Sequence, residues 1–290
     1  MREKDLFEEV IEAMYESDNE DSNILVAKQI TFGGKSYENY GQVVMVGGGS
    51  GSGKRFQISQ LFGITGKNYD VDSLKEFVKK NNILREKLSE KYGVSESVFD
   101  MKTPKDVSEV HSIIKQEGLQ QKYENMIFNM AKYSGEKTKP NLIFDKTFSS
   151  FVDFVYVTER VKEMGYDPKN IHFVWVVNDY RVALEQNKKR SRTVDENVVM
   201  SIHKHTSMTI KDILQLGDKL RKYMDGDFWI SFNKIDVDVK SEKLGENNYH
   251  ITDATYYKIK EKGGSLVSYE ELNKDMINKI KEYVPNGEIW

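Results

Sequence analysis

The sequence predicts an α/β fold built on a doubly wound, mostly parallel sheet with helices packed on its faces. Short apolar runs have the composition of strands that are buried on both sides, which is typical of a parallel sheet covered by helices. Amphipathic helical stretches separate the runs, and a glycine-rich turn follows the first of them. The runs are residues 42–46, 141–144, 171–177 and 228–232, with a weaker strand at 68–71.

Helical periodicity accounts for much of the remaining chain. More helix falls between residues 85 and 137 than one crossover between strands needs, which predicts a helical cap insertion. The tail after residue 235 mixes alternating segments with a final helix, which predicts a small C-terminal β/α extension. The expected helices are 1–20, 56–62, 73–92, 107–117, 119–133, 151–164, 181–189, 210–224 and 269–283, and the further expected strands are 23–32, 249–251 and 265–268.

One large domain with additions is the expected organisation, because 290 residues are enough to bury a full α/β core. Residues 1–40 are expected to form an N-terminal helical or extended arm. Residues 41–235 form the core, with the cap insertion at 85–137 and a basic lid at 186–196. Residues 236–290 form the C-terminal extension.

Composition limits the class of protein. The 43 Lys and Arg residues nearly balance the 46 Asp and Glu residues, and the formal charge of -3 is no footprint of a general nucleic-acid binder, although a local basic groove stays open. The absence of cysteine excludes disulfides, thiolate zinc sites and a cysteine nucleophile. No run of eighteen apolar residues and no signal peptide is present, so a cytoplasmic protein without a membrane partner is expected.

The glycine-rich turn between residues 47 and 54 predicts a phosphate-binding loop. It follows an expected strand and precedes an expected helix, which is the context that such a loop needs. Glycines let the backbone adopt positive φ angles and approach phosphate oxygens closely, and Lys54 supplies a positive charge for the β and γ phosphates of a nucleotide. The residues expected to bind the nucleotide are Gly48, Gly49, Ser50, Gly51, Ser52, Gly53, Lys54 and Arg55.

The residue after the loop lysine departs from the usual pattern. Arg55 stands where a Ser or Thr hydroxyl would bind Mg²⁺. Asp145 follows the strand 141–144, where a carboxylate can bind Mg²⁺ directly or through water, and Ser52 is a second candidate ligand. A turn acid that only caps backbone N–H groups remains an alternative for Asp145. Arg55 also leaves open a degenerate loop that binds a nucleotide without transferring phosphate.

Two acids follow the weaker strand and precede a helix. Either Asp70 or Asp72 could accept the proton of an attacking hydroxyl, and Asp72 is favoured. A helix cap explains an acid at this point equally well.

The segment from Gln186 to Val194 concentrates four cations. Guanidinium groups there, those of Arg190 and Arg192, could bind phosphate oxygens and neutralise charge during transfer. A solvated charged face is the alternative reading. His203 and His205 stand two residues apart, which on a helix points them to different faces, so a metal pair is not expected.

With these pieces in order, the chain resembles the zeta-toxin-like P-loop kinases, particularly the uncharacterised kinase proteins of that type carried by large tailed bacteriophages. The resemblance covers roughly residues 40 to 235, and the stretches that carry it are 43–54 (VVMVGGGSGSGK), 141–147 (NLIFDKT), 165–167 and 174–194. It implies a doubly wound sheet of the P-loop kinase type and cytoplasmic action, in a bacterial host if the chain is phage-encoded.

The resemblance also implies roles for single residues. A loop lysine that binds ATP phosphates corresponds to Lys54, and an acid that acts as the base corresponds to Asp72 or Asp70. Arginines that stabilise the migrating phosphoryl group correspond to Arg190 and Arg192. The residues around Asp72 lack a clear family motif. Related kinases modify nucleotide sugars, polynucleotide ends or modified DNA bases, and the sequence does not choose among these acceptors.

These expectations combine into an ATP-dependent phosphotransferase that uses Mg²⁺ and moves the γ-phosphoryl group of ATP to a hydroxyl of a nucleotide, a nucleotide sugar or a nucleic acid. Two alternatives stay open. One is a non-catalytic nucleotide-binding interaction protein with a degenerate loop. The other is a kinase specific for polynucleotides or modified DNA bases.

Overall fold

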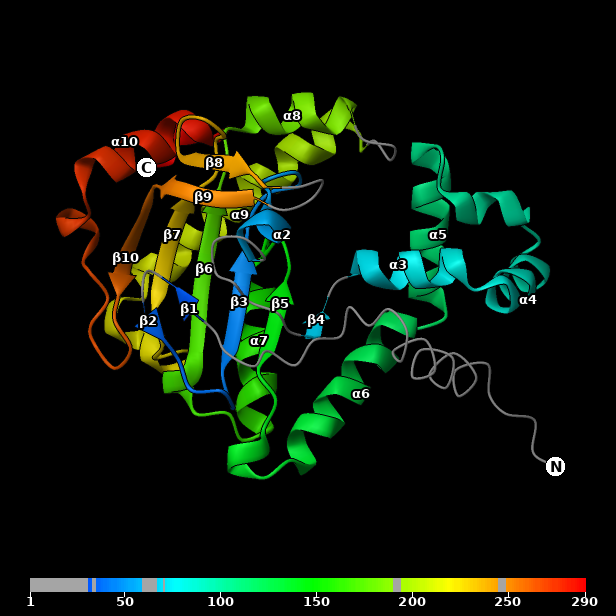
Figure 1. The fold of residues 1–290 in the computed structure, drawn as a ribbon, viewed down its shortest axis with the longest axis horizontal. Coiled ribbons are helices and arrows are strands. Elements are labelled where there is room, and N and C mark those ends of the chain that lie inside the picture. Colours follow the sequence, from blue (N-terminus) through cyan, green and yellow to red (C-terminus); the bar gives the residue numbers. More distant parts are fainter. Residues whose placement is uncertain (1–30, 33–34, 59–66, 70, 190–193, 245–248) are drawn as a thin grey trace.

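The computed structural model describes residues 31–32, 35–58, 67–69, 71–189, 194–244 and 249–290 (Figure 1). Several sequence predictions lie outside these residues. They are the helix at 1–20, most of the strand at 23–32, the end of the helix at 56–62, and the candidate site residues Asp70, Arg190 and Arg192.

A six-stranded sheet lies at the centre of the fold, with the strand order β10-β7-β6-β3-β5-β4. Five neighbouring strands are parallel, and β10 pairs antiparallel with β7 at one edge. A mixed α/β fold with a mostly parallel sheet is therefore confirmed. The strands are β3 (Val43–Gly47), β4 (Lys67–Tyr69), β5 (Leu142–Asp145), β6 (Ile171–Val177), β7 (Phe228–Phe232) and β10 (Tyr256–Lys260).

The parallel strands match the buried apolar runs of the sequence within one residue, apart from the short β4. Each is long enough to cross the core, and every residue of β3, β6 and β7 is buried. Figure 1 shows their carboxyl ends along one edge, with α2 (Lys54–Phe56) beyond the end of β3. This shared edge is where the connecting loops can bring side chains from several strands together.

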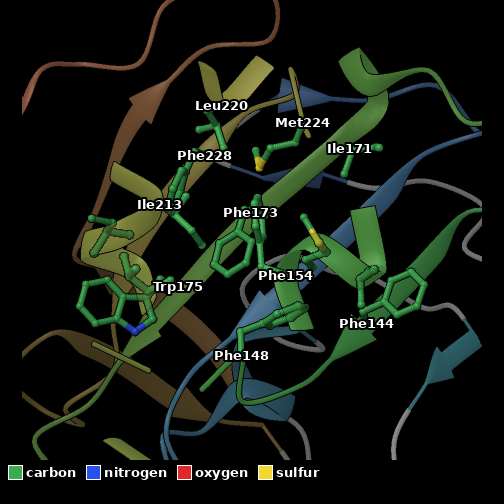
Figure 2. Close-up of a cluster of buried hydrophobic side chains, with 14 of the residues drawn as sticks. Phe144, Phe148, Phe154, Ile171, Phe173, Trp175, Ile213, Leu220, Met224 and Phe228 are labelled. Carbon is green, nitrogen blue, oxygen red and sulfur yellow. The ribbon is translucent and has the colours of Figure 1, made fainter. Parts of the chain in front are cut away.

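The main core lies between one face of the sheet and four helices. Alternate residues of β3, β5, β6 and β7, among them Met45, Phe144, Phe173 and Phe228, point to this face. Figure 2 shows Phe173 at the centre of the cluster, and its ring lies 5.3 Å from that of Phe148 and 5.1 Å from that of Phe228. The helices that contribute are α6 (Leu119–Tyr133), α7 (Phe151–Glu163), α9 (Glu196–Gln215) and α10 (Lys274–Tyr283).

The opposite face carries a smaller cluster made of the other set of strand residues. Among the described residues outside the strands, Tyr37 and Ile58 belong to this cluster. The described helices thus pack mainly on one face, and the doubly wound arrangement in its full form stays a prediction.

A third hydrophobic cluster lies in the insertion between β4 and β5. Leu88, Phe99 and Val110 are at its centre, and Figure 1 shows α3, α4 and α5 beyond the β4 edge of the sheet. The helices are α3 (Val71–Lys80), α4 (Asn82–Tyr92) and α5 (Pro104–Gln116), followed by α6. These helices have apolar contacts of their own, as the sequence suggests for a cap, although its bounds at 85–137 stay a prediction.

The prediction of a single helix at 73–92 is wrong in one respect, because Asn81 divides this stretch into two helices. Its backbone is extended (φ -95, ψ 101), and its side chain accepts a hydrogen bond from the amide of Leu84. Asparagine is a strong N-cap because its short side chain competes with helical hydrogen bonding. The helical periodicity on both sides concealed this break.

The second half of the chain also differs from the expected elements. The helix expected at 210–224 is instead α9, which begins fourteen residues earlier at Glu196 and is followed by a short 3₁₀ helix at Gly217–Lys222. No strand forms at 265–268, where Leu266 makes an isolated bridge to Lys260. The remaining elements are β1 (Thr31–Phe32), β2 (Lys35–Ser36), α8 (Tyr180–Lys188), β8 (Val239–Lys243) and β9 (Tyr249–Ala254).

Replacing the central ring of the core should destabilise the fold strongly. Phe173 is fully buried, so Phe173→Ala should lower the free energy of unfolding by about 3–5 kcal/mol, measured by urea denaturation. Val152→Ala is the control, because Val152 on α7 is 73% exposed and its loss should change stability by about 0.5 kcal/mol or less. Equal effects of the two substitutions would contradict this description of the core.

Candidate active site

The loop 48–53 lies at the carboxyl edge of the sheet, where β3 is flanked by β5 on one side and β6 on the other. From β3 the chain goes first to the β4 edge and later returns past β3 to β6. Ligands of open α/β sheets bind at such points, because the loops on the two sides run in opposite directions and leave a crevice.

Two glycines are required by their surroundings. Gly53 has φ +82, and a Cβ there would lie 2.0 Å from Nδ2 of Asn233. A Cβ at Gly49 would lie 2.4 Å from the ring of His203. Any side chain at these positions would force the loop to move, so the sequence of the loop is dictated by its path.

The loop presents backbone amides that the protein does not use. Within the described part of the chain, no hydrogen bond is donated by the N–H groups of Gly49, Ser50, Gly51 and Gly53. Unused amides gathered in one tight bend form a concave site of positive partial charge, which is suited to an anion such as a phosphate group. The loop therefore fits the nucleotide that the sequence predicts.

Lys54 folds back over this bend. Its Nζ donates hydrogen bonds to the carbonyls of Gly48 and Gly49 at 3.1 and 3.4 Å, and lies 3.8 Å from Oδ1 of Asp145. Asp145 ends β5, opposite Val46 of β3, as expected from the sequence. The structure thus brings the candidate lysine and the candidate metal-binding carboxylate to the same place.

Ser52 is buried in the loop, and its Oγ has no hydrogen-bond partner among the described residues. The same is true of Oδ1 of Asn178, directly after β6. A buried polar atom without a hydrogen-bond partner lowers the stability of the fold, and such atoms often pair with a ligand, ion or water. Orphaned oxygens at this edge agree with a polar ligand.

The residues present are compatible with Mg²⁺, although the described residues contain no group of three or more His, Cys, Asp or Glu that could hold a metal by themselves. Mg²⁺ is usually bound by one or two protein oxygens together with phosphates and water, so Asp145 and Ser52 would be sufficient protein ligands. Arg55 is exposed in the first turn of α2 and provides no hydroxyl.

Of the candidate bases and arginines, only Asp72 lies within the described residues. Asp72 lies in the first turn of α3, the position of a helix-terminal acid, and the role of its side chain stays a prediction. Asp70, Arg190 and Arg192 lie outside the described residues. The two ends of the predicted basic lid, however, lie within the described residues. The side chain of the buried Asn187 donates a 2.6 Å hydrogen bond to the carbonyl of Val194 and accepts a 3.0 Å hydrogen bond from its amide.

Three residues that the sequence analysis did not assign to the site support the loop. His203 Nε2 lies 2.9 Å from the carbonyl oxygen of Ser50, and Asn233 donates a 2.8 Å hydrogen bond to the carbonyl of Ser52. Gln57 in turn donates to Asn233 at 2.9 Å. His203 shares a buried helical stripe with Val199 and Ile210, so the periodicity of α9 could have identified it, whereas no local signal marks Asn233.

His203 and His205 indeed point to different faces of one helix. His203 is buried against the loop, while His205 is exposed and contacts Ser201 one turn earlier. Burial, helped by the nearby charge of Lys54, lowers the pKa of His203, although its hydrogen bond to the Ser50 carbonyl opposes that shift. The imidazole is therefore neutral at pH 7, and its Nε2–H donates to the carbonyl of Ser50.

A charged cluster lies beside the loop, after the carboxyl ends of β6 and β7. The buried carboxylate of Asp179 accepts hydrogen bonds from the Arg181 guanidinium at 2.8 and 2.9 Å and from Lys234 at 3.0 Å. Burial raises the pKa of Asp179, but the hydrogen bonds from Arg181 and Lys234 outweigh it and hold this pKa below its usual value. Asp179 therefore stays charged and orients two cations at the edge of the site.

No protein-family model matches the chain, and the search of curated proteins finds no match. Solved structures do resemble it. A native AvrRxo1-ORF1:-ORF2 complex matches with a TM-score of 0.43 and 12% identity over 98% of this chain and 79% of that chain. A form of this complex with ATP matches with a TM-score of 0.39 and 12% identity over 86% of this chain and 73% of that chain.

A structure from the PezAT chromosomal toxin-antitoxin system of Streptococcus pneumoniae matches with a TM-score of 0.40 and 13% identity over 77% of this chain and 76% of that chain. All three TM-scores are below 0.5, so these likenesses carry no conclusion, and the function has to be argued from the site itself. The resemblance to phage proteins stays a prediction. No helix among the described residues is both long and apolar enough to cross a membrane.

The lowered pKa of His203 predicts a pH dependence of stability. The unfolded chain binds a proton on this histidine near its reference pKa of about 6.5, whereas the folded protein resists protonation until a lower pH. The free energy of unfolding should therefore fall as the pH drops below about 6.5. His203→Gln should show a smaller loss between pH 7 and 5 in urea denaturation, and an identical loss in both proteins would contradict the assignment.

Proposed function

We propose that the protein is an ATP-dependent phosphotransferase that moves the γ-phosphoryl group of ATP to a hydroxyl acceptor. The observation that carries the proposal is the loop 48–53. Its unused amides gather beside Lys54, and Asp145 stands 3.8 Å from that lysine at the carboxyl edge of a parallel sheet. This combination serves a nucleotide phosphate chain better than any other common ligand, because it offers both anion-binding amides and a carboxylate for a metal ion.

The residues of the chain act mainly by positioning and by charge. The amides of the loop bind phosphate oxygens, and Lys54 exchanges its contacts with the Gly48 and Gly49 carbonyls for contacts with the phosphates. Asp145 and Ser52 would hold Mg²⁺ directly or through water, and the ion would neutralise charge on the β and γ phosphates. Arg190 and Arg192 are proposed to stabilise the migrating group, and Asp72 or Asp70 to accept the proton of the hydroxyl.

Removal of the loop lysine tests the proposal. Lys54→Ala should lower the turnover of γ-phosphoryl transfer by about 10²-fold or more, because charge on the phosphates is then left uncompensated. The measurement is transfer of label from γ-labelled ATP, with nucleotides, nucleotide sugars and oligonucleotides offered in parallel. Lys169→Ala is a matched control, since Lys169 lies directly before β6 at the opposite edge of the sheet. Unchanged transfer by Lys54→Ala would refute the kinase assignment.

Arg55 is the observation that favours a second candidate, a protein that binds a nucleotide without transferring phosphate. Calorimetry with ATP, with and without Mg²⁺, combined with the same labelled assay separates the two. Tight binding with no transfer to any acceptor class would favour the binder. Strongly salt-dependent binding of a short oligonucleotide would instead favour a polynucleotide kinase.

A further inference from the structure

A chain of hydrogen bonds runs from the end of β7 into the loop. The hydroxyl of Ser231 donates to Oε1 of Gln57 at 2.8 Å, and Nε2 of Gln57 donates to Oδ1 of Asn233 at 2.9 Å. Nδ2 of Asn233 then donates to the carbonyl of Ser52 at 2.8 Å. All donors point the same way, and the chain ends at a backbone oxygen of the loop.

This chain is buried and carries no charge. Ser231 and Gln57 are fully buried, and Asn233 is 5% exposed. Hydrogen bonds in series polarise one another, and they are stronger where water is excluded. Each side chain also fixes which end of the next carboxamide faces it, so Asn233 is locked with its donor towards the loop.

His203 makes a corresponding contact at the other side of the loop. It comes from α9, and its Nε2 lies 2.9 Å from the carbonyl oxygen of Ser50. Its ring fills the space beside Gly49, where a Cβ would lie 2.4 Å away. Two carbonyls of the loop, those of Ser50 and Ser52, are thus held by side chains distant in the sequence.

Because the peptide bond is planar, these two contacts also determine where the N–H groups of the following residues point. In a trans peptide, the C=O of one residue and the N–H of the next point in opposite directions. A donor that holds the Ser52 carbonyl therefore aims the N–H of Gly53 to the other side, and the contact of His203 with Ser50 does the same for Gly51. Both of these amides are among the unused ones of the loop.

Such external support is physically needed. Amides that converge on one point have parallel dipoles that repel one another when no anion lies between them. Gly51 and Gly53 have φ values of +74 and +82, and glycine can leave this region easily because it has no side chain. Without something to hold the outward carbonyls, the bend could relax when the site is empty.

We propose that Asn233 and His203 are positioning residues that preorganise the phosphate-binding loop, by holding the carbonyls of Ser52 and Ser50 so that the amides of Gly53 and Gly51 face the phosphate. The inference rests on the proposed function in so far as the ligand of the loop is a phosphate chain. It holds equally for a kinase and for a protein that only binds nucleotides. Preorganised amides bind more strongly because they need no rearrangement when the ligand arrives.

The test compares the affinity of the loop for pyrophosphate with the stability of the ligand-free protein. Asn233→Ala removes the donor to Ser52 and should weaken pyrophosphate binding about tenfold or more, as measured by calorimetry. A tenfold loss of affinity corresponds to about 1.4 kcal/mol of binding free energy. Asn141→Ala is the matched control. It deletes a buried carboxamide that accepts a 2.9 Å hydrogen bond from the amide of Gln42 at the opposite edge of the sheet.

The histidine offers a rescue experiment. His203→Gln keeps an N–H donor in place of Nε2 and should bind pyrophosphate within about threefold of the unaltered protein, since a factor of three is under 1 kcal/mol. His203→Leu fills similar space without a donor and should weaken binding as Asn233→Ala does. Urea denaturation of every variant separates a change in the loop from general loss of stability.

The inference is supported if Asn233→Ala and His203→Leu lose affinity for pyrophosphate while His203→Gln keeps it. The control Asn141→Ala should also keep its affinity, even though its free energy of unfolding is lowered. Unchanged affinity in Asn233→Ala and His203→Leu would overturn the inference, and so would an equal loss in Asn141→Ala. Failure of the proposed function alone looks different, because the affinities would then follow this pattern while no acceptor is labelled from γ-labelled ATP. The loop would not be a phosphate site at all if the unaltered protein bound pyrophosphate no better than Lys54→Ala does. That outcome would overturn both.

Discussion

The candidate site depends on one constraint, which is the path of the backbone between β3 and α2, because this path leaves the N–H groups of Gly49, Ser50, Gly51 and Gly53 without a partner among the described residues. This arrangement creates a positive concave surface, and every other feature of the site follows from it. Glycine is required where Asn233 and His203 approach the loop, at Gly53 and Gly49, because neither place has room for a side chain. Lys54 completes the surface, and Asp145 faces it from the neighbouring strand.

The parallel sheet makes this constraint possible. Because β3, β5, β6 and β7 end along one edge, residues at or just after their ends gather there. Asp145 at the end of β5 lies 3.8 Å from Lys54, the charge of Asp179 after β6 acts on His203, and Asn233 after β7 donates to the carbonyl of Ser52. The main hydrophobic core holds the strand ends in place. The ring of Phe173 lies 2.9 Å from where a Cβ of Gly47 would be, so the last residue of β3 is fixed directly against the aromatic cluster.

Local patterns in the sequence were sufficient for the mostly parallel sheet and for the position of the glycine-rich loop after β3. Buried strands appear as apolar runs, so Asp145 could be located at the end of a strand. A phosphate loop is a continuous motif, so Lys54 could be located in it without tertiary information. The support of the loop could not be found this way. Asn233, Gln57 and His203 act through contacts between residues 153–181 positions apart in the chain, and no local pattern records such contacts. The break at Asn81 was missed because apolar spacing continues through a residue whose capping preference prevails.

The central claim is that the inward amides of the loop bind phosphate, and a titration followed by nuclear magnetic resonance tests it most directly. With ¹⁵N-labelled protein, the amide signals of Gly49, Ser50, Gly51 and Gly53 should shift when ADP is added and should remain in place when adenosine is added. Shifts of the same size with adenosine, or none with ADP, would show that the loop does not bind the phosphate chain and would contradict the account.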